Sequence, residues 1–99
     1  MRVERSAEFA KWFDSADNTT QVRVAARLQK IQAHGHLGEF KNLGQGLSEL
    51  KWKIGLRVYF AIAQDQDGNV FVALLGGGKD GQSRDISKAR SVLERYRAD

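Results

Sequence analysis

The sequence predicts an α+β fold, in which an N-terminal helical hairpin and a C-terminal helix pack on one face of a small twisted antiparallel sheet. Three observations favour this class. Apolar residues recur every three to four positions before residue 35 and after residue 83. Between these segments they alternate every second position. Proline is absent, so Gly, Asn, Asp and Ser must form the turns, and they divide the chain into short segments.

Two helices are expected in the first third of the chain. The first spans residues 6–15, with Ser6 as its N-cap. The second spans residues 19–33 and ends near Gly35. In each helix the apolar side chains form one stripe at helical spacing: Phe9, Trp12 and Phe13 in the first, and Val24, Leu28 and Ile31 in the second. The two neighbouring helices therefore predict a hairpin.

Strands are expected next. Leu50, Trp52 and Ile54 alternate with charged residues, which is typical of a half-buried strand. Residues 57–64 alternate in the same way, and residues 70–75 are apolar on both faces, as in a central strand. Residues 65–69 form the tight connection between these two strands. Residues 2–4 are expected to add a short strand, and helical spacing returns from about residue 83.

Length and composition exclude several classes of protein. The 99 residues fit one domain, residues 1–99, and are too few for an enzyme with a separate cofactor domain. Without cysteine there is no disulfide, no thiolate catalysis and no cysteine-based zinc site. No apolar run approaches the roughly 20 residues that span a bilayer. We therefore expect a cytoplasmic protein with no membrane contact.

Charge favours an anionic partner. Sixteen Lys and Arg against twelve Asp and Glu give a net charge of +4. The excess lies in the second half, because residues 51–99 carry nine basic and six acidic groups. A nucleic acid or an acidic protein segment is the kind of partner that this balance predicts.

A cluster of cations is expected on the sheet. If Leu50 and Trp52 face the helices, the opposite face presents Lys51 and Lys53, with Arg57 and Tyr59 on the neighbouring strand. Cross-strand neighbours lie about 5 Å apart, so three cations would gather around one phosphate. Lys79 and Arg84 flank the glycine-rich exit of the next strand and would join them.

Such a cluster suits RNA cleavage without a metal ion. A base removes the 2′-hydroxyl proton, cations stabilise the charged phosphorane, and an acid protonates the leaving 5′ oxygen. The same pattern also fits a solvated strand face, because lysine commonly lies on exposed sheets. The residues alone leave these two interpretations open.

Three further motifs predict no site. The glycines at residues 76–78 precede Lys79, but this segment lacks the first glycine and the hydroxyl residue of a P-loop. Residues 65–69 fit a hairpin turn better than a calcium loop, because no bidentate Glu follows in place. His34 and His36 have no third ligand nearby, which favours a polar loop over a metal site.

The chain resembles a family of bacterial toxins. Two segments carry the resemblance, residues 47–60 (LSELKWKIGLRVYF) and residues 74–89 (LLGGGKDGQSRDISKA). With the Glu4-Arg5-Ser6 start and the first helix, they are similar to the RelE/HigB group of type II toxins in the RelE/ParE superfamily, specifically the phage Gp49-like "addiction module killer protein" branch. The resemblance covers nearly the whole chain and implies a RelE-like fold.

The resemblance also implies an activity. It implies an mRNA endoribonuclease, or mRNA interferase, that cuts message in the ribosomal A site, needs no metal or other cofactor, and inhibits translation. It further implies neutralisation by a cognate antitoxin, commonly a helix-turn-helix protein. Lys51, Lys53 and Arg57 match the residues that contact and activate the scissile phosphate. Lys79 matches the lysine that follows the strand-terminal glycine, and we expect it to bind the RNA backbone.

Two positions depart from the family pattern. Asp80 stands where an arginine is usual, and Ile86 stands where a late tyrosine is usual. One stabilising cation and one stacking or acid group are thus missing from their places, which leaves Arg84 and Tyr59 as the candidates to replace them in RNA binding.

Two alternative functions follow from the same resemblance. ParE proteins share the superfamily but inhibit DNA gyrase without cutting RNA. An inert member would retain only antitoxin binding and operon regulation. Fold likeness does not choose between these activities. The closely spaced lysines of the predicted strand pair favour RNA.

Overall fold

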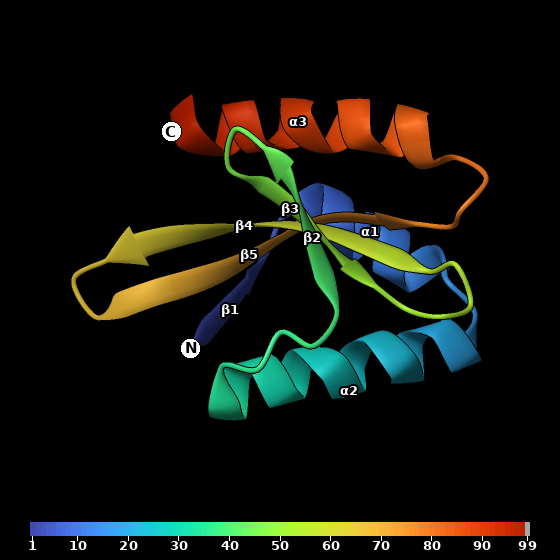
Figure 1. The fold of residues 1–99 in the computed structure, drawn as a ribbon, viewed down its shortest axis with the longest axis horizontal. Coiled ribbons are helices and arrows are strands. Elements are labelled where there is room, and N and C mark those ends of the chain that lie inside the picture. Colours follow the sequence, from blue (N-terminus) through green and yellow to red (C-terminus); the bar gives the residue numbers. More distant parts are fainter. Residues whose placement is uncertain (99) are drawn as a thin grey trace.

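The computed structural model describes residues 1–98, which form a five-stranded sheet between helices (Figure 1). The strand order is β1-β5-β4-β3-β2. β1 runs parallel to β5, and the other neighbours are antiparallel. The elements follow the chain as β1 (Arg2–Arg5), α1 (Ala7–Ser15), α2 (Asn18–His34), β2 (Phe40–Gly44), β3 (Leu47–Lys51), β4 (Arg57–Asp65), β5 (Gly68–Gly77) and α3 (Gln82–Ala98).

Local side-chain chemistry sets the helix boundaries, as predicted. Ser6 Oγ accepts a hydrogen bond from the backbone N–H of Phe9 at 3.0 Å, which caps α1. The same hydroxyl donates to the Leu74 carbonyl at 2.9 Å and so ties the start of α1 to β5. Asp17 caps α2 by accepting from the N–H of Thr20 at 2.8 Å. Gly35 ends α2 in the left-handed region at φ 72°.

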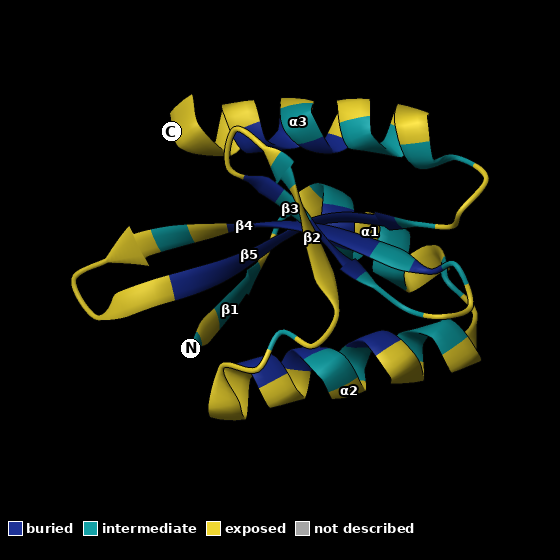
Figure 2. Cartoon of the chain, viewed as in Figure 1, coloured by how far each residue is buried: buried dark blue, intermediate teal, exposed yellow. Residues whose placement is uncertain are grey.

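The helices lie on both faces of the sheet, so the prediction of helices on one face is wrong. α1 and α2 cover one face, and α3 covers the other (Figure 1). Each face has its own core, which contains Phe9, Leu28 and Phe60 on one side and Leu47, Ala89 and Leu93 on the other. The central strands are buried on both faces at residues 58–61 of β4 and 70–76 of β5, which requires a cover on each face there (Figure 2).

The sheet differs from the prediction in three further ways. It is mixed, because the parallel strand β1 pairs with β5. It contains a fifth strand, β2, whose mostly exposed residues carry no alternating pattern. The strand expected at residues 50–54 ends at Lys51, because Trp52 and Leu56 pair across a turn in which Gly55 has a φ of 93°. Lys53 therefore lies on a turn instead of a strand.

No helix within residues 1–98 has both the length and the apolar character that crossing a bilayer requires.

Candidate functional site

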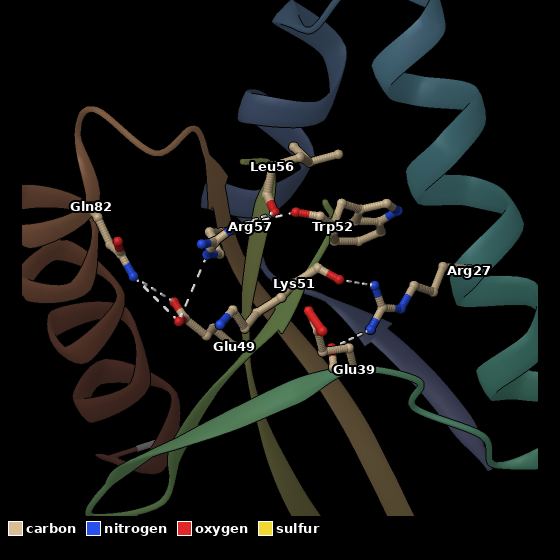
Figure 3. Close-up of polar contacts among 8 residues, drawn as sticks. All are labelled: Arg27, Glu39, Glu49, Lys51, Trp52, Leu56, Arg57 and Gln82. Atoms are coloured by element: carbon tan, nitrogen blue, oxygen red, sulfur yellow. Dashed lines mark hydrogen bonds and ion pairs between the residues drawn. The ribbon is translucent and has the colours of Figure 1, made fainter. Parts of the chain in front are cut away.

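The candidate site lies at one end of the sheet, where β3 ends, β4 begins and β5 ends. Lys51 pairs with Arg57 across β3 and β4, and Arg57 pairs in turn with Gly77 of β5. Lys51 and Arg57 are thus cross-strand neighbours on one face. The side chain of Lys51 extends toward Glu49, while its main-chain carbonyl accepts a hydrogen bond from Arg27 Nη1 at 2.5 Å (Figure 3).

Arg57 is mostly buried and already has partners within the chain. Its side chain is 12% exposed, and its Nε lies 3.8 Å from Glu49 Oε1. Its Nη1 donates to the Leu56 carbonyl at 3.1 Å and to the Trp52 carbonyl at 3.5 Å (Figure 3). Arg57 therefore helps to fix the turn that carries Lys53, and most of its side chain is inaccessible to solvent.

Glu49 is the member of this cluster that the sequence reasoning missed. Its side chain is 1% exposed, and Gln82 of α3 donates to its two oxygens at 3.2 and 3.3 Å. A buried carboxylate is retained when a cation and hydrogen-bond donors compensate its charge. The alternation of β3 could have indicated its place, because Glu49 and Lys51 are two residues apart and so lie on the same face of the strand. Glu49 pairs with Tyr59 of β4.

Tyr59 is fully buried, which corrects its expected role as a surface group for RNA binding. The residue is 0% exposed and belongs to the core beneath α3. Within residues 1–98 its hydroxyl has no hydrogen-bond partner. Burial, reinforced by the nearby carboxylates of Glu49 and Asp85, raises the pKa of Tyr59 to about 12. A ring enclosed in this way does not stack on a base.

Asp85, in the first turn of α3, approaches the same cluster. Burial raises the pKa of its carboxyl. A Cβ at Gly77 would lie 2.1 Å from Asp85 Oδ2, so only glycine gives α3 room to approach β5 here. The helix thus closes a polar layer over Arg57 and Tyr59.

Lys53 and Lys79 lie on the exposed side of the site. Lys53 is exposed on the turn, and Lys79 is exposed on the loop after β5. A Cβ at Gly55 would lie 3.2 Å from the Cβ of Lys79, so Lys79 packs against the turn that carries Lys53. Both lysines are exposed, whereas Arg57 is mostly buried.

Arg84 lies beside a separate hollow. The hollow has a volume of about 420 Å³ and is lined by residues of the loop and the first turn of α3, among them Lys79, Asp80 and Arg84. The guanidinium of Arg84 folds back over Gly81. Asp80 lines the same hollow as Lys79 and Arg84 and lowers its net positive charge.

The chemistry available at this end of the sheet is ionic. An exposed layer holds Lys53, Lys79 and Arg84, and a buried layer holds the Arg57–Glu49 pair, with Lys51 between them. Within residues 1–98, no three His, Asp or Glu side chains come together in a way that would hold a metal ion.

Comparison with known proteins identifies the fold. No family model matches the sequence. A protein of Haemophilus influenzae described as uncharacterized is 28% identical over 97 residues, covering 95% of this chain and 94% of that protein. The structure of a YoeB/ParE toxin from Agrobacterium tumefaciens has a TM-score of 0.61 at 8% identity, covering 79% of this chain and 98% of that one. A conserved hypothetical protein from Helicobacter pylori has a TM-score of 0.48 at 16% identity, covering 83% and 98%.

The likeness to the Agrobacterium structure confirms the predicted fold class. This chain has the α+β architecture of that toxin, with three helices around a five-stranded mixed sheet within residues 1–98.

Proposed function

We propose that this chain is the toxin of a type II toxin–antitoxin module and an endoribonuclease that cuts ribosome-bound mRNA. One observation carries the proposal: Lys51 and Arg57 are cross-strand partners beside the buried carboxylate of Glu49, next to the turn that carries Lys53 and against which Lys79 packs. The fold shared with a YoeB/ParE toxin supports it.

The arrangement suggests a division of roles. Lys53 and Lys79, which are exposed, bind the RNA backbone first, and Arg84 extends this surface. Lys51 lies beside Arg57 and supplies the base or the charge stabilisation. Arg57 stabilises the phosphorane, because it is held in place before substrate arrives and needs no reorganisation. Glu49 is a positioning residue that acts through Arg57.

The reaction balances without a co-reactant. The 2′-oxygen loses its proton to the base and attacks the adjacent phosphorus, and the bond from phosphorus to the 5′ oxygen breaks. A protonated lysine returns a proton to the leaving 5′ oxygen. The products are a 2′,3′-cyclic phosphate and a 5′-hydroxyl end, and the charge on the phosphorane is met by lysine and arginine side chains.

Expression without a partner protein tests the proposal. Wild-type chain is expected to stop growth and to produce cleaved transcripts with new 5′ ends, detected by primer extension. Lys51→Ala with Lys53→Ala should lower the cleavage rate by roughly 100-fold or more, as loss of an acid or base does. Lys88→Ala on the exposed part of α3 is the matched control and should leave cleavage unchanged. Intact transcripts during growth arrest would overturn the nuclease proposal.

Inhibition of DNA gyrase is a second candidate function. We keep it because the ion pair of Arg57 and the burial of Tyr59 leave fewer groups free for RNA chemistry than the sequence predicts. Purified protein would then block supercoiling by gyrase in vitro while transcripts stay intact. Supercoiling at the normal rate, together with cleaved transcripts, would exclude it.

A further inference from the structure

A second basic surface lies on the other face of the sheet, along α2. This helix contains no Asp or Glu between Asn18 and His34. Its Arg23, Arg27, Lys30 and His34 follow one another at steps of four, three and four residues, which places them on one side of the helix. The stripe extends over about 16 Å, at 1.5 Å per residue.

This stripe borders a groove, which we call the α2 groove. It has a volume of about 750 Å³ and lies between α2, the loop that follows it and the Trp52 turn. The four basic residues of the stripe line it on one side, and Ala26, Leu37 and Trp52 give it an apolar floor.

Arg27 gives the α2 groove a fixed, poorly compensated positive charge. Its Nη1 donates to the Lys51 carbonyl at 2.5 Å, and its Nε and Nη2 donate to the Leu37 carbonyl at 3.0 and 2.8 Å. Nη2 also donates to the Glu39 carbonyl (Figure 3). These acceptors are neutral, and burial lowers the pKa of Arg27, with the Glu39 charge opposing that shift. An anionic group in the groove would supply the compensation that backbone carbonyls do not.

The floor of the groove distinguishes between two anionic partners. Proteins that bind single-stranded RNA combine cations along its backbone with open aromatic faces on which its bases stack. Arg27 already covers one face of Trp52, with its Cζ 4.4 Å from the ring centroid. An apolar floor beneath a row of cations instead matches a helix that has apolar residues on one side and carboxylates beside them.

We propose that the α2 groove binds an acidic amphipathic helical segment of a partner protein, whose apolar residues contact Leu37 and Trp52 and whose carboxylates meet Arg23 and Lys30. In the toxin proposed above this segment belongs to the antitoxin, and that identification rests on the proposed function. The groove lies on the α2 face of the sheet and Arg57 faces α3, so this partner need not cover the catalytic residues.

A peptide titration tests the proposal with the full chain. The probe is a fluorescein-labelled peptide of Glu and Leu, about 16 residues long, with Leu at every third or fourth position. Wild-type protein should bind it in a salt-dependent manner. Arg23→Glu with Lys30→Glu should weaken binding roughly tenfold or more, because both charges then repel the probe. Both positions are exposed, and Arg23→Gln with Lys30→Gln is the milder pair if the first fails to fold.

A matched control pair distinguishes binding in the groove from a general effect of net charge. Lys11→Glu with Lys88→Glu makes the same charge change at exposed positions of α1 and α3, and should alter affinity by less than about twofold. Equal weakening by this control pair would overturn the proposal. Equal binding of a peptide with Gln in place of Glu, or of a scrambled peptide, would also overturn it.

Two further results keep this inference separate from the proposed function. The Arg23 and Lys30 variant can also be titrated with an oligouridylate strand. If this variant binds the oligouridylate more weakly than wild-type protein does but binds the peptide equally well, the groove binds RNA and the proposal is overturned. The titration requires no nuclease activity. Protein that binds the peptide but leaves mRNA intact would refute the nuclease alone, whereas protein that cuts mRNA but ignores the peptide would refute the groove alone.

Discussion

Arg57 and Glu49 form a buried ion pair in which Nε and Oε1 lie 3.8 Å apart and the carboxylate is 1% exposed. Bringing two charges out of water costs several kcal/mol per ion, and this cost is offset only while both partners and their hydrogen bonds remain. Gln82 supplies hydrogen bonds to the carboxylate, and the Leu56 carbonyl accepts one from the guanidinium. The pair therefore couples α3, β3 and β4 at the candidate site.

Glu49→Gln is expected to lower the free energy of unfolding by about 3 kcal/mol, because it leaves the Arg57 charge uncompensated. Arg57→Met should have a comparable effect. The double variant should lose clearly less than the sum of the two, since it removes both charges together. Urea denaturation of all four proteins measures this coupling, and additive losses would show that the pair contributes nothing.

The pair between Arg95 and Glu8 provides the matched control for this cycle. Its nitrogen and oxygen lie closer, at 2.5 Å, but its side chains are 66% and 27% exposed. Exposed pairs contribute about 0 to 1 kcal/mol because water and salt screen them. Glu8→Gln should therefore change the free energy of unfolding by less than about 1 kcal/mol, although its contact distance is shorter.

Tyr59→Phe is expected to raise the free energy of unfolding by about 1 kcal/mol, because it removes a buried hydroxyl that has no partner within residues 1–98. Urea denaturation at neutral pH checks this. Growth arrest should be unchanged, since the ring is enclosed beneath α3. Loss of the arrest in a stable Tyr59→Phe protein would show that this hydroxyl takes part in the function after all.

The same residue predicts a stability change at high pH. Burial raises the pKa of Tyr59 to about 12 in the folded state, whereas an unfolded tyrosine titrates near 10. The folded state therefore holds the Tyr59 proton more tightly than the unfolded state does. The stability that this difference contributes is fully present below pH 10 and is lost as the pH rises toward 12. Over that pH interval the free energy of unfolding should fall more steeply for the wild-type protein than for Tyr59→Phe. Parallel plots of this free energy against pH would contradict the raised pKa of Tyr59.

Arg27→Lys is expected to lower the free energy of unfolding by roughly 2 kcal/mol, because a lysine cannot reach the carbonyls of Leu37, Glu39 and Lys51 together. It also loses the stacking of the guanidinium on Trp52. Arg23→Lys, one turn earlier and exposed, is the control and should change little. Thermal melting of the two variants measures this difference, and equal melting midpoints would contradict the prediction.

Local chemistry explains why some elements were predictable and others were not. Ser6 and Gly35 mark helix boundaries by hydrogen bonding and by backbone conformation, both of which are encoded in neighbouring residues. The position of α3 is different, because helical periodicity shows which side of a helix is apolar but not which face of the sheet it covers. β2 escaped prediction because it is an edge strand with exposed residues, including Phe40.

The candidate site shows the same division. Alternation put Lys51 and Arg57 on one face of the sheet, and the structure pairs them across β3 and β4. It assigned that face to solvent, whereas α3 covers it, so Arg57 and Tyr59 are more buried than expected. Lys53 lies on the turn because Gly55 adopts a positive φ. The packing of Trp12 against Gly76 of β5 depends on contacts between residues far apart in sequence.

Gly76→Ala tests that long-range contact. A Cβ at Gly76 would lie 2.4 Å from three ring carbons of Trp12, and the Trp12 ring also packs against Phe9, with their centroids 5.7 Å apart. Inserting a methyl group into such a contact costs about 1 to 3 kcal/mol, since the ring or the strand must shift. Gly78→Ala is the control, because its Cβ would meet open space at an ordinary φ. Urea denaturation should separate the two, and equal stabilities would mean that Trp12 repacks without cost.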